Sequence, residues 1–172
     1  NSSDNTPTFN WTTATDYDSD TITYRIQIDN ESSFADPIII DNLSVPTHNY
    51  ITNQTLAEGA YFWRVATITS DTNSSFSSNR SFLVDTIFPN ISLINPTQVN
   101  FSNLSQSFIF VNTSVVEVNG FNVTINLLNI SGSVVRTNST KNNTAFFSNY
   151  TGLTDGNYTI NISVNDSSGN LN

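Results

Sequence analysis

Apolar and polar residues alternate along several stretches of the chain, and this alternation is the main structural signal in the sequence. Apolar side chains occupy every second position from Ile22 to Ile28 and again from Phe121 to Leu127. A period of two is typical of strands that bury one face, and no stretch shows the period of an amphipathic helix. Turn-forming pairs such as Asn119-Gly120 and Asp155-Gly156 separate the stretches. The pattern predicts an all-β protein.

A spaced motif, Leu-x-x-Gly-x-Tyr, occurs twice. The copies span residues 56–61 and 153–158, so they are displaced by 97 residues. Each copy leads into an alternating run, which begins at Tyr61 in the first and at Tyr158 in the second. Such self-similarity indicates a repeated module of about 100 residues. We therefore expect two antiparallel β-sandwiches in tandem.

The residues around these motifs resemble known modules. Residues 7–11 (PTFNW), 16–20 (DYDSD) and 59–65 (GAYFWRV) are similar to a prokaryotic fibronectin type III domain. Residues 155–160 (DGNYTI) and 165–170 (NDSSGN) resemble the Ig-like repeats of bacterial and archaeal surface proteins. The resemblance implies a fibronectin type III-like sandwich over 1–86 and an Ig-like sandwich over 87–172. It also implies that Tyr61 and Tyr158 form structural tyrosine corners.

The two modules differ in length at opposite ends. Residues 84–89 (VDTIFP) resemble a linker between such modules, so Pro89 serves as a reference point. The second motif begins 64 residues after Pro89, whereas only 55 residues precede the first, a deficit of about one strand. Pro89 follows Tyr61 by 28 residues, whereas only 14 follow Tyr158. The first module is therefore expected to lack its first strand and the second its last. Either another copy supplies these strands, or the sequence is cut from a longer tandem-repeat polypeptide.

Acceptor triplets for N-linked glycosylation, Asn-x-Ser/Thr with x other than proline, are unusually dense. Nineteen of the 27 asparagines begin such a triplet, whereas the Ser and Thr content would give roughly seven by chance. The density predicts covalent N-linked glycans, and the alternative is a polar, Asn-rich chain whose triplets stay unmodified. The predicted acceptors are Asn1, Asn10, Asn30, Asn42, Asn53, Asn73, Asn79, Asn90, Asn100, Asn103, Asn112, Asn122, Asn129, Asn138, Asn142, Asn149, Asn157, Asn161 and Asn165.

Parity along the expected strands predicts where some acceptors point. Asn157, Asn161 and Asn165 alternate with apolar residues, so they are expected on one outward face, about 13 Å apart. Asn122 is expected to point away from the core for the same reason. Asn112 shares parity with two phenylalanines of the apolar run 108–111, so it is expected to face inward.

Composition and charge restrict the possible partners. Five cations among 14 acids give a net charge of −9, so nucleic acid and anionic membrane surfaces are poor partners. No apolar run is long enough to cross a bilayer. Only 11% of residues are charged, so neutral side chains and sugars must solvate the surface. Cysteine is absent and no signal peptide opens the chain, so we expect a processed portion of a longer, extracellular product without disulfides.

Candidate catalytic or metal-binding residues are few. His48 is the single histidine and cysteine is absent, so zinc and thiol chemistry lack ligands, and we expect neither enzyme activity nor a cofactor. Asp16, Asp18 and Asp20 alternate as calcium ligands do, but Thr21 stands where an EF-hand loop has glycine. A solvated acidic turn is the alternative. The aromatic residues near Trp11 and Trp63 are expected in the core rather than on a sugar-stacking platform.

These features predict a structural glycoprotein. We expect a heavily N-glycosylated subunit or segment of an extracellular filament, pilus-like fibre or surface layer of an archaeal or bacterial cell. It would assemble head-to-tail with copies of itself by strand donation, or consist of tandem repeats of one chain. One alternative is an adhesive or carbohydrate-binding module of a larger cell-surface protein. Another is an accessory domain of a secreted polysaccharide-degrading enzyme, because fibronectin type III modules often accompany such enzymes.

Overall fold

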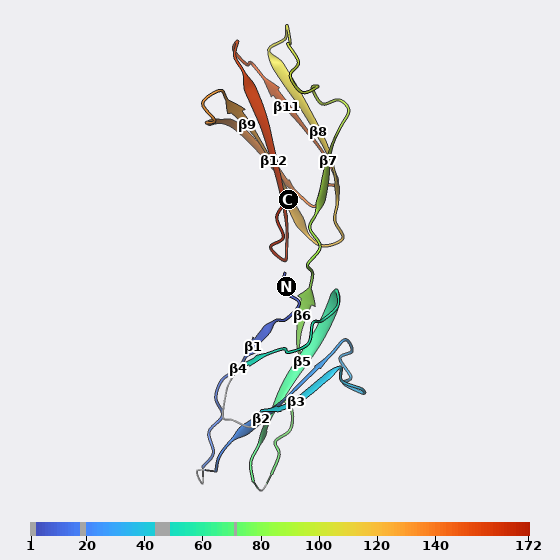
Figure 1. Cartoon of the computed structure of the whole chain (residues 1–172), viewed down its shortest axis with the longest axis vertical. Helices are drawn as coiled ribbons and strands as arrows, with labels where there is room; N and C mark the ends of the chain where they lie inside the picture. The colour runs from blue at the N-terminus through green and yellow to red at the C-terminus, as the bar shows by residue number, and fades with distance from the viewer. Residues whose placement is uncertain (1–2, 18–19, 44–48, 71) are drawn as a thin grey trace. The chain divides into compact units, whose positions relative to one another are not determined.

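The computed structural model describes residues 3–17, 20–43, 49–70 and 72–172. These residues form strands, turns and loops without a helix, so the chain is all-β, as predicted (Figure 1). It follows that no described helix is long and apolar enough to cross a membrane. The chain divides into two compact units, Asn1–Thr86 and Ile87–Asn172. These ranges coincide with the two modules expected from the sequence.

The first unit is a sandwich of two antiparallel sheets. The larger sheet has the strand order β3-β2-β5-β6 and the smaller sheet pairs β1 with β4. Phe9 and Tyr50 of the small sheet share one core with Tyr24, Ile26 and Ile28 of the large sheet. The strands are β1 (Thr8–Asn10), β2 (Thr23–Asp29), β3 (Ile39–Leu43), β4 (Asn49–Ile51), β5 (Gly59–Ile68) and β6 (Arg80–Val84).

The second unit is also a sandwich, made of two three-stranded antiparallel sheets. Their strand orders are β11-β8-β7 and β10-β9-β12. Val111 and Val115 of one sheet share a core with Val123, Ile125 and Leu127 of the other. The strands are β7 (Asn90–Ile94), β8 (Phe108–Val116), β9 (Phe121–Asn129), β10 (Val134–Lys141), β11 (Ala145–Thr151) and β12 (Tyr158–Asp166).

Strand order shows that the two units share one plan. Matching β1 to β5 with β8 to β12, in order, reproduces both sheets: β1-β4 becomes β8-β11, and β3-β2-β5 becomes β10-β9-β12. Strand β7 then has no counterpart among the described residues before β1, and β6 has none among those after β12. Within the described residues, the two units therefore differ by one strand at each end of the shared set of five. Both units have the two-sheet plan of Ig-like and fibronectin type III-like modules.

Equivalent tyrosines occupy the starts of β5 and β12. The Tyr61 hydroxyl donates a hydrogen bond to the Ala57 carbonyl at 3.0 Å, and the Tyr158 hydroxyl donates to the Thr154 carbonyl at 3.0 Å. Each bond spans four residues and fixes the turn that precedes the strand. This is the contact that a tyrosine corner makes.

Strand β8 has the opposite parity to the one expected from the sequence. Val111, Thr113 and Val115 face the core and are almost fully buried, whereas Asn112 lies half-buried on the outward face. The prediction that Asn112 faces inward is therefore wrong. A polar residue is tolerated inside because the Thr113 hydroxyl donates to the Phe146 carbonyl at 3.1 Å.

Candidate assembly edges and glycan acceptors

The first unit is hollowed beside β1. A groove of about 650 Å³ is lined by the end of β1, by β5 and by the segment between β5 and β6, with Trp11, Trp63 and Arg80 among its walls. Within the described residues β1 pairs only with β4, so its other edge is open. In the second unit, β7 lies against the corresponding edge of β8. The open edge of β1 is thus where the missing first strand would lie.

Trp11 brings an unsatisfied donor to this groove. Its indole Nε1 is buried and has no hydrogen-bond partner among the described residues. Its ring packs edge-on against Tyr24, with 5.3 Å between the centroids. A buried donor without a partner destabilises a fold by about 1–3 kcal/mol. Trp11 is partly buried and packs against the core of the first unit, where the sequence analysis expected it.

One wall of the groove is held firmly by the segment that follows β5. The Ser77 backbone N–H donates to the Val65 carbonyl at 2.8 Å, and the Val65 N–H donates to the Ser77 hydroxyl at 3.2 Å. The Arg64 guanidinium lies 4.1 Å from the ring centre of Phe34 and 4.3 Å from that of Phe76. These contacts tie the segment to the larger sheet.

The second unit has its open edge along β12. Residues 171–172 run antiparallel to the end of β12: the Asn172 N–H donates to the Val164 carbonyl and the Val164 N–H donates to the Asn172 carbonyl, both at 2.8 Å. Val164 is fully buried there. Farther along, Tyr158, Ile160 and Ile162 pack against the core but stay half-exposed. Within the described residues, positions 158–163 pair only with β9, so the other edge of this stretch is open.

Asp166 directs the chain back along β12. Its Oδ1 accepts hydrogen bonds from the backbone N–H groups of Ser168, Gly169 and Asn170 at 2.8–3.0 Å, and its Oδ2 accepts from the Asn170 side-chain amide at 2.7 Å. Gly169 has φ +99°, which favours glycine. The run 165–170 is therefore a turn built around one buried carboxyl group.

The predicted glycan acceptors lie at the surface. Asn1 lies outside the described residues, and none of the other 18 acceptor asparagines is buried. Asn112, Asn122 and Asn129 are half-buried and the remaining acceptors are exposed. By contrast, Asn170 is 4% exposed and does not begin an acceptor triplet. The geometry of the described acceptors is thus compatible with modification.

Acceptors on β12 share its outward face. Asn157, just before the strand, and Asn161 and Asn165 within it are all exposed and alternate with the residues that pack against the core. Asn165 pairs directly with Asn122 of β9. Opposite side chains in an antiparallel pair lie about 5 Å apart. Glycans on both members of this pair would therefore be crowded at their roots.

Some acceptor amides already donate hydrogen bonds. The Nδ2 groups of Asn79, Asn112 and Asn138 donate to the Ser32 carbonyl, the Asn95 carbonyl and the Ser148 hydroxyl at 2.8–3.0 Å. An amide nitrogen that carries a sugar keeps one N–H. These contacts can therefore persist after modification and would fix the direction in which a sugar leaves the sheet.

The calcium candidate is only partly described. Asp18 lies outside the described residues, as does His48. Asp16 and Asp20 are half-buried, and the Asp20 carboxylate accepts a hydrogen bond from the Ser70 hydroxyl at 3.4 Å. Calcium binding at these positions stays a prediction.

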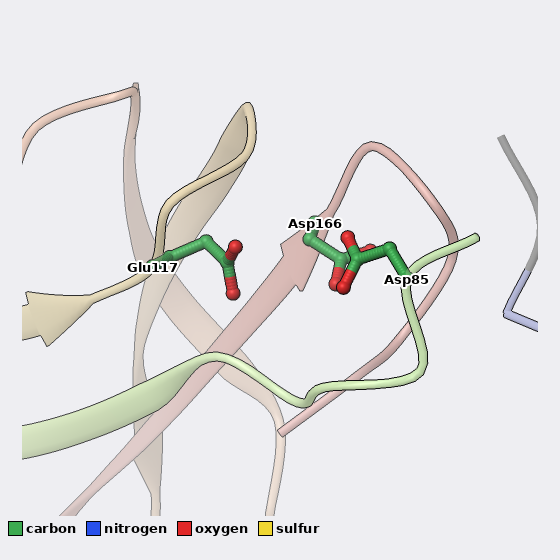
Figure 2. A group of neighbouring side chains, drawn as sticks. All are labelled: Asp85, Glu117 and Asp166. Atoms are coloured by element: carbon green, nitrogen blue, oxygen red, sulfur yellow. The ribbon is translucent and has the colours of Figure 1, made fainter. Parts of the chain in front are cut away.

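Figure 2 shows another acidic group, which the sequence analysis did not single out. Carboxylate oxygens of Asp85, Glu117 and Asp166 lie within 4.8 Å of one another. These residues are far apart in the sequence, so no spacing pattern reveals them. The Asp166 carboxylate already accepts the hydrogen bonds of its turn. We assign no function to this group.

Comparisons with known proteins give only distant structural similarities. No protein-family model and no curated protein matches the chain. The FN1–FN3 domains of chicken CNTN1 are 14% identical, with a TM-score of 0.49; the match covers 98% of this chain and 57% of that one. The fibronectin(III)-like modules of Clostridium thermocellum CbhA are 18% identical, with a TM-score of 0.44 and coverages of 91% and 76%. A two-domain fibronectin type III segment of chicken tenascin is 13% identical, with a TM-score of 0.42 and coverages of 98% and 87%.

The chain thus spans a little over half of the chicken CNTN1 chain that it resembles. At these identities and scores the similarities carry no argument about function. The assignment of the fold rests on the strand order and the shared cores of the two units.

Proposed function

We propose that the chain is a structural, N-glycosylated segment of an extracellular filament, pilus-like fibre or surface layer, in which each open edge receives a strand from neighbouring polypeptide. The observation that carries the proposal is the complementary pair of open edges. Among the described residues, the edge of β1 away from β4 has no strand partner, and the edge of β12 away from β9 is paired only near its end. Units that are incomplete at opposite ends suit head-to-tail repetition.

Strand addition is physically favourable at both edges. A strand laid along β1 would pair with its free backbone groups, cover the groove and place a carbonyl near the Trp11 indole. A strand continued along β12 would cover Tyr158, Ile160 and Ile162. Open edges with apolar side chains beside them otherwise invite uncontrolled aggregation. Completion of each sandwich removes that hazard and makes the contact between units specific.

The donor is a segment outside the described residues. The described start of the chain is already engaged, because the carbonyls of Asn5 and Pro7 accept hydrogen bonds from the N–H groups of Leu56 and Thr52 at 2.8 and 3.4 Å. A second copy or a longer tandem chain can supply the donor, and both give the same local contact.

The glycan coat is the second part of the proposal. The surface accessibility of the described acceptors supports it, together with a content of charged residues of only 11%. Attached sugars would hydrate a surface that is poor in charge and would keep neighbouring filaments apart. The proposal therefore places the protein outside the cell.

Images of native material combined with peptide mass spectrometry test both parts. We expect particles with an axial repeat of one or two sandwich lengths, strand density along β1 and along residues 158–163, and additional density at acceptor asparagines. Bare amides throughout would overturn the glycoprotein assignment. Dispersed single particles with both edges open would overturn strand completion.

A second candidate function is carbohydrate binding. The groove of the first unit contains the side chains of Trp11, Trp63 and Tyr24, and aromatic rings bind the apolar faces of sugars. Under this alternative the chain is an adhesive module of a surface protein or an accessory domain of a polysaccharide-degrading enzyme. Retention of the soluble monomer on a polysaccharide column, lost in Trp11→Ala but kept in the exposed control Tyr17→Ala, would favour it.

A further inference from the structure

The outward face of the β11-β8-β7 sheet carries a row of aromatic side chains. The rings of Phe108 and Phe110 on β8 have centroids 4.8 Å apart, and those of Phe110 and Phe147 have centroids 5.5 Å apart. Phe147 is 46% exposed and the other two are half-exposed. An apolar row on the outside of a sandwich is a surface that another group is expected to cover.

Two acceptor asparagines are interleaved with this row. In the β8–β11 pair, Asn112 lies directly opposite Phe147, and Phe110 lies directly opposite Asn149. Along the strands, Asn112 follows Phe110 by two positions and Asn149 follows Phe147 by two positions. Residues that are paired or two apart share a face, so the four side chains alternate in a two-by-two block.

The spacing in this block suits a sugar on each asparagine. Paired side chains begin about 5 Å apart and side chains two apart along a strand about 6.6 Å apart. A pyranose ring linked to an asparagine amide therefore has two phenyl rings within reach. One face of a pyranose is rich in C–H groups, which are attracted to the negative face of an aromatic ring.

We propose that the first sugar of a glycan on Asn149 packs against Phe110 and that the first sugar on Asn112 packs against Phe147, so that the glycans cover the aromatic row. This inference rests on the N-glycosylation in the proposed function and adds a structural role for two particular sites. The ligand class is a pyranose with an apolar face, such as an N-acetylhexosamine or a hexose.

Hydrogen bonds hold the Asn112 side chain toward the end of β7, so a first sugar there must turn back across β8 to reach Phe147. The Asn112 Nδ2 donates to the Asn95 carbonyl at 2.8 Å, and its backbone N–H donates to the Thr97 hydroxyl at 2.9 Å. The amide keeps one N–H when it carries a sugar, so this contact orients the linkage. The third residues of both triplets, Ser114 and Thr151, lie on the same outward face as their asparagines.

Mass spectrometry of the full chain from its native cells is the first test. Occupied Asn112 and Asn149 are the expected result. Occupancy at other acceptors with both of these bare would overturn this inference and leave the proposed glycoprotein intact. Absence of sugar at every acceptor would overturn the proposed function itself, so the two failures are distinguishable.

A double-mutant comparison in an N-glycosylating host is the second test. Asn149→Gln is expected to lower the unfolding midpoint of the second unit by about 4 °C, and to have little effect in the Phe110→Ser background. Asn161→Gln is the matched control, because Asn161 is an exposed acceptor opposite Asn126 and two positions after Thr159, without an aromatic neighbour at these positions. Equal midpoints for Asn149→Gln and Asn161→Gln would contradict the proposal.

Nuclear magnetic resonance gives a readout that a loss of stability alone does not produce. Protons of the first sugar at Asn149 are expected to shift upfield through the ring current of Phe110, and the shift is expected to disappear in Phe110→Ser. The pair Asn112 and Phe147 repeats the test if Phe110→Ser does not fold, since Phe147 is more exposed. Sugar resonances at unshifted positions for both pairs would overturn the inference.

Discussion

Tyr61 and Tyr158 are equivalent residues with different surroundings, and the difference shows what a closing strand does. Tyr61 is 6% exposed and stacks on Phe82 of β6, with 5.5 Å between the ring centroids. Tyr158 makes the same hydrogen bond to the chain four residues upstream but stays half-exposed. The second unit has no counterpart of β6 among its described residues. The five strands common to both units thus define the fold, whereas the last strand covers the tyrosine at the edge of the sheet.

The same comparison applies at the other side of the sandwich. In the second unit β7 covers one edge of β8 through five residue pairs. In the first unit the equivalent edge of β1 is bordered by the groove and by the unsatisfied Trp11 indole. Each unit therefore contains the counterpart of the strand that has no equivalent among the described residues of the other.

We expect the largest effect from substitutions in the core of each unit, and they test whether the two units unfold independently. Ile26 and Ile125 occupy equivalent positions and are both fully buried. Ile26→Ala and Ile125→Ala are each expected to lower the free energy of unfolding of their own unit by about 3 kcal/mol, through lost burial and a residual cavity. Denaturation of the full chain, followed by a probe in each unit, measures this. Equal loss in both units from either change would show that the units unfold as one.

A smaller effect is expected when the contact between β6 and Tyr61 in the first unit is removed. Phe82→Ala deletes the ring that covers Tyr61, and we expect a loss of about 2 kcal/mol because the side chain is only partly buried. The variant should also make Tyr61 as accessible as Tyr158, which chemical nitration of tyrosines can measure. Exposed Ile40→Ala on β3, the edge strand at the opposite side of the same sheet, is the control, with a change below about 0.5 kcal/mol.

The tyrosine corners provide a finer comparison. Tyr61→Phe is expected to cost about 1 kcal/mol, the usual net value of a hydrogen bond, and Tyr158→Phe less because its hydroxyl is more accessible to water. Supplying the missing strand should raise the cost of Tyr158→Phe toward that of Tyr61→Phe. An equal cost in the isolated chain would show that the open edge leaves the corner unaffected.

The smallest expected effect is a decline of stability in alkali. Burial raises the pKa of the Tyr50 hydroxyl in the first unit, with the negative charge of Asp41 adding to it, and burial raises the pKa of Tyr150 in the second. Because the pKa of each tyrosine is raised in the folded state, its contribution to stability is complete at pH values below the ordinary pKa of 10.0. The contribution is lost as the pH rises through the folded-state pKa. Each unit should therefore weaken above about pH 10.

Tyr50→Phe and Tyr150→Phe separate the two alkaline contributions. Each change should reduce the alkaline loss of stability in its own unit only. Unfolding measured at a series of pH values from neutral to alkaline checks this. At neutral pH, Tyr150→Phe should cost about 1 kcal/mol, because the hydroxyl donates to the Ile125 carbonyl at 2.8 Å. An unchanged alkaline decline in both variants would assign it to other groups.

The strands were predictable wherever one face is apolar and the other polar, as in β2, β9 and β12. Residue counts around a repeated motif led to the prediction of missing strands, because equivalent modules need equivalent lengths, and this stays a prediction. The orientation of β8 was predicted wrongly, because its outward face carries aromatic residues and its inward face carries Thr113, whose hydroxyl has a hydrogen-bond partner inside. The groove beside β1 and the block around Asn112 were not predictable, because both depend on pairings between distant strands.

The Arg64 guanidinium held between Phe34 and Phe76 has a consequence for how units can join. Both rings belong to the same unit as Arg64, so these contacts form without an incoming strand. The wall beside the open edge of β1 is accordingly in place before any strand arrives. Little ordering entropy then remains to be lost from this wall when units join, so joining should be fast and should not wait for a folding step.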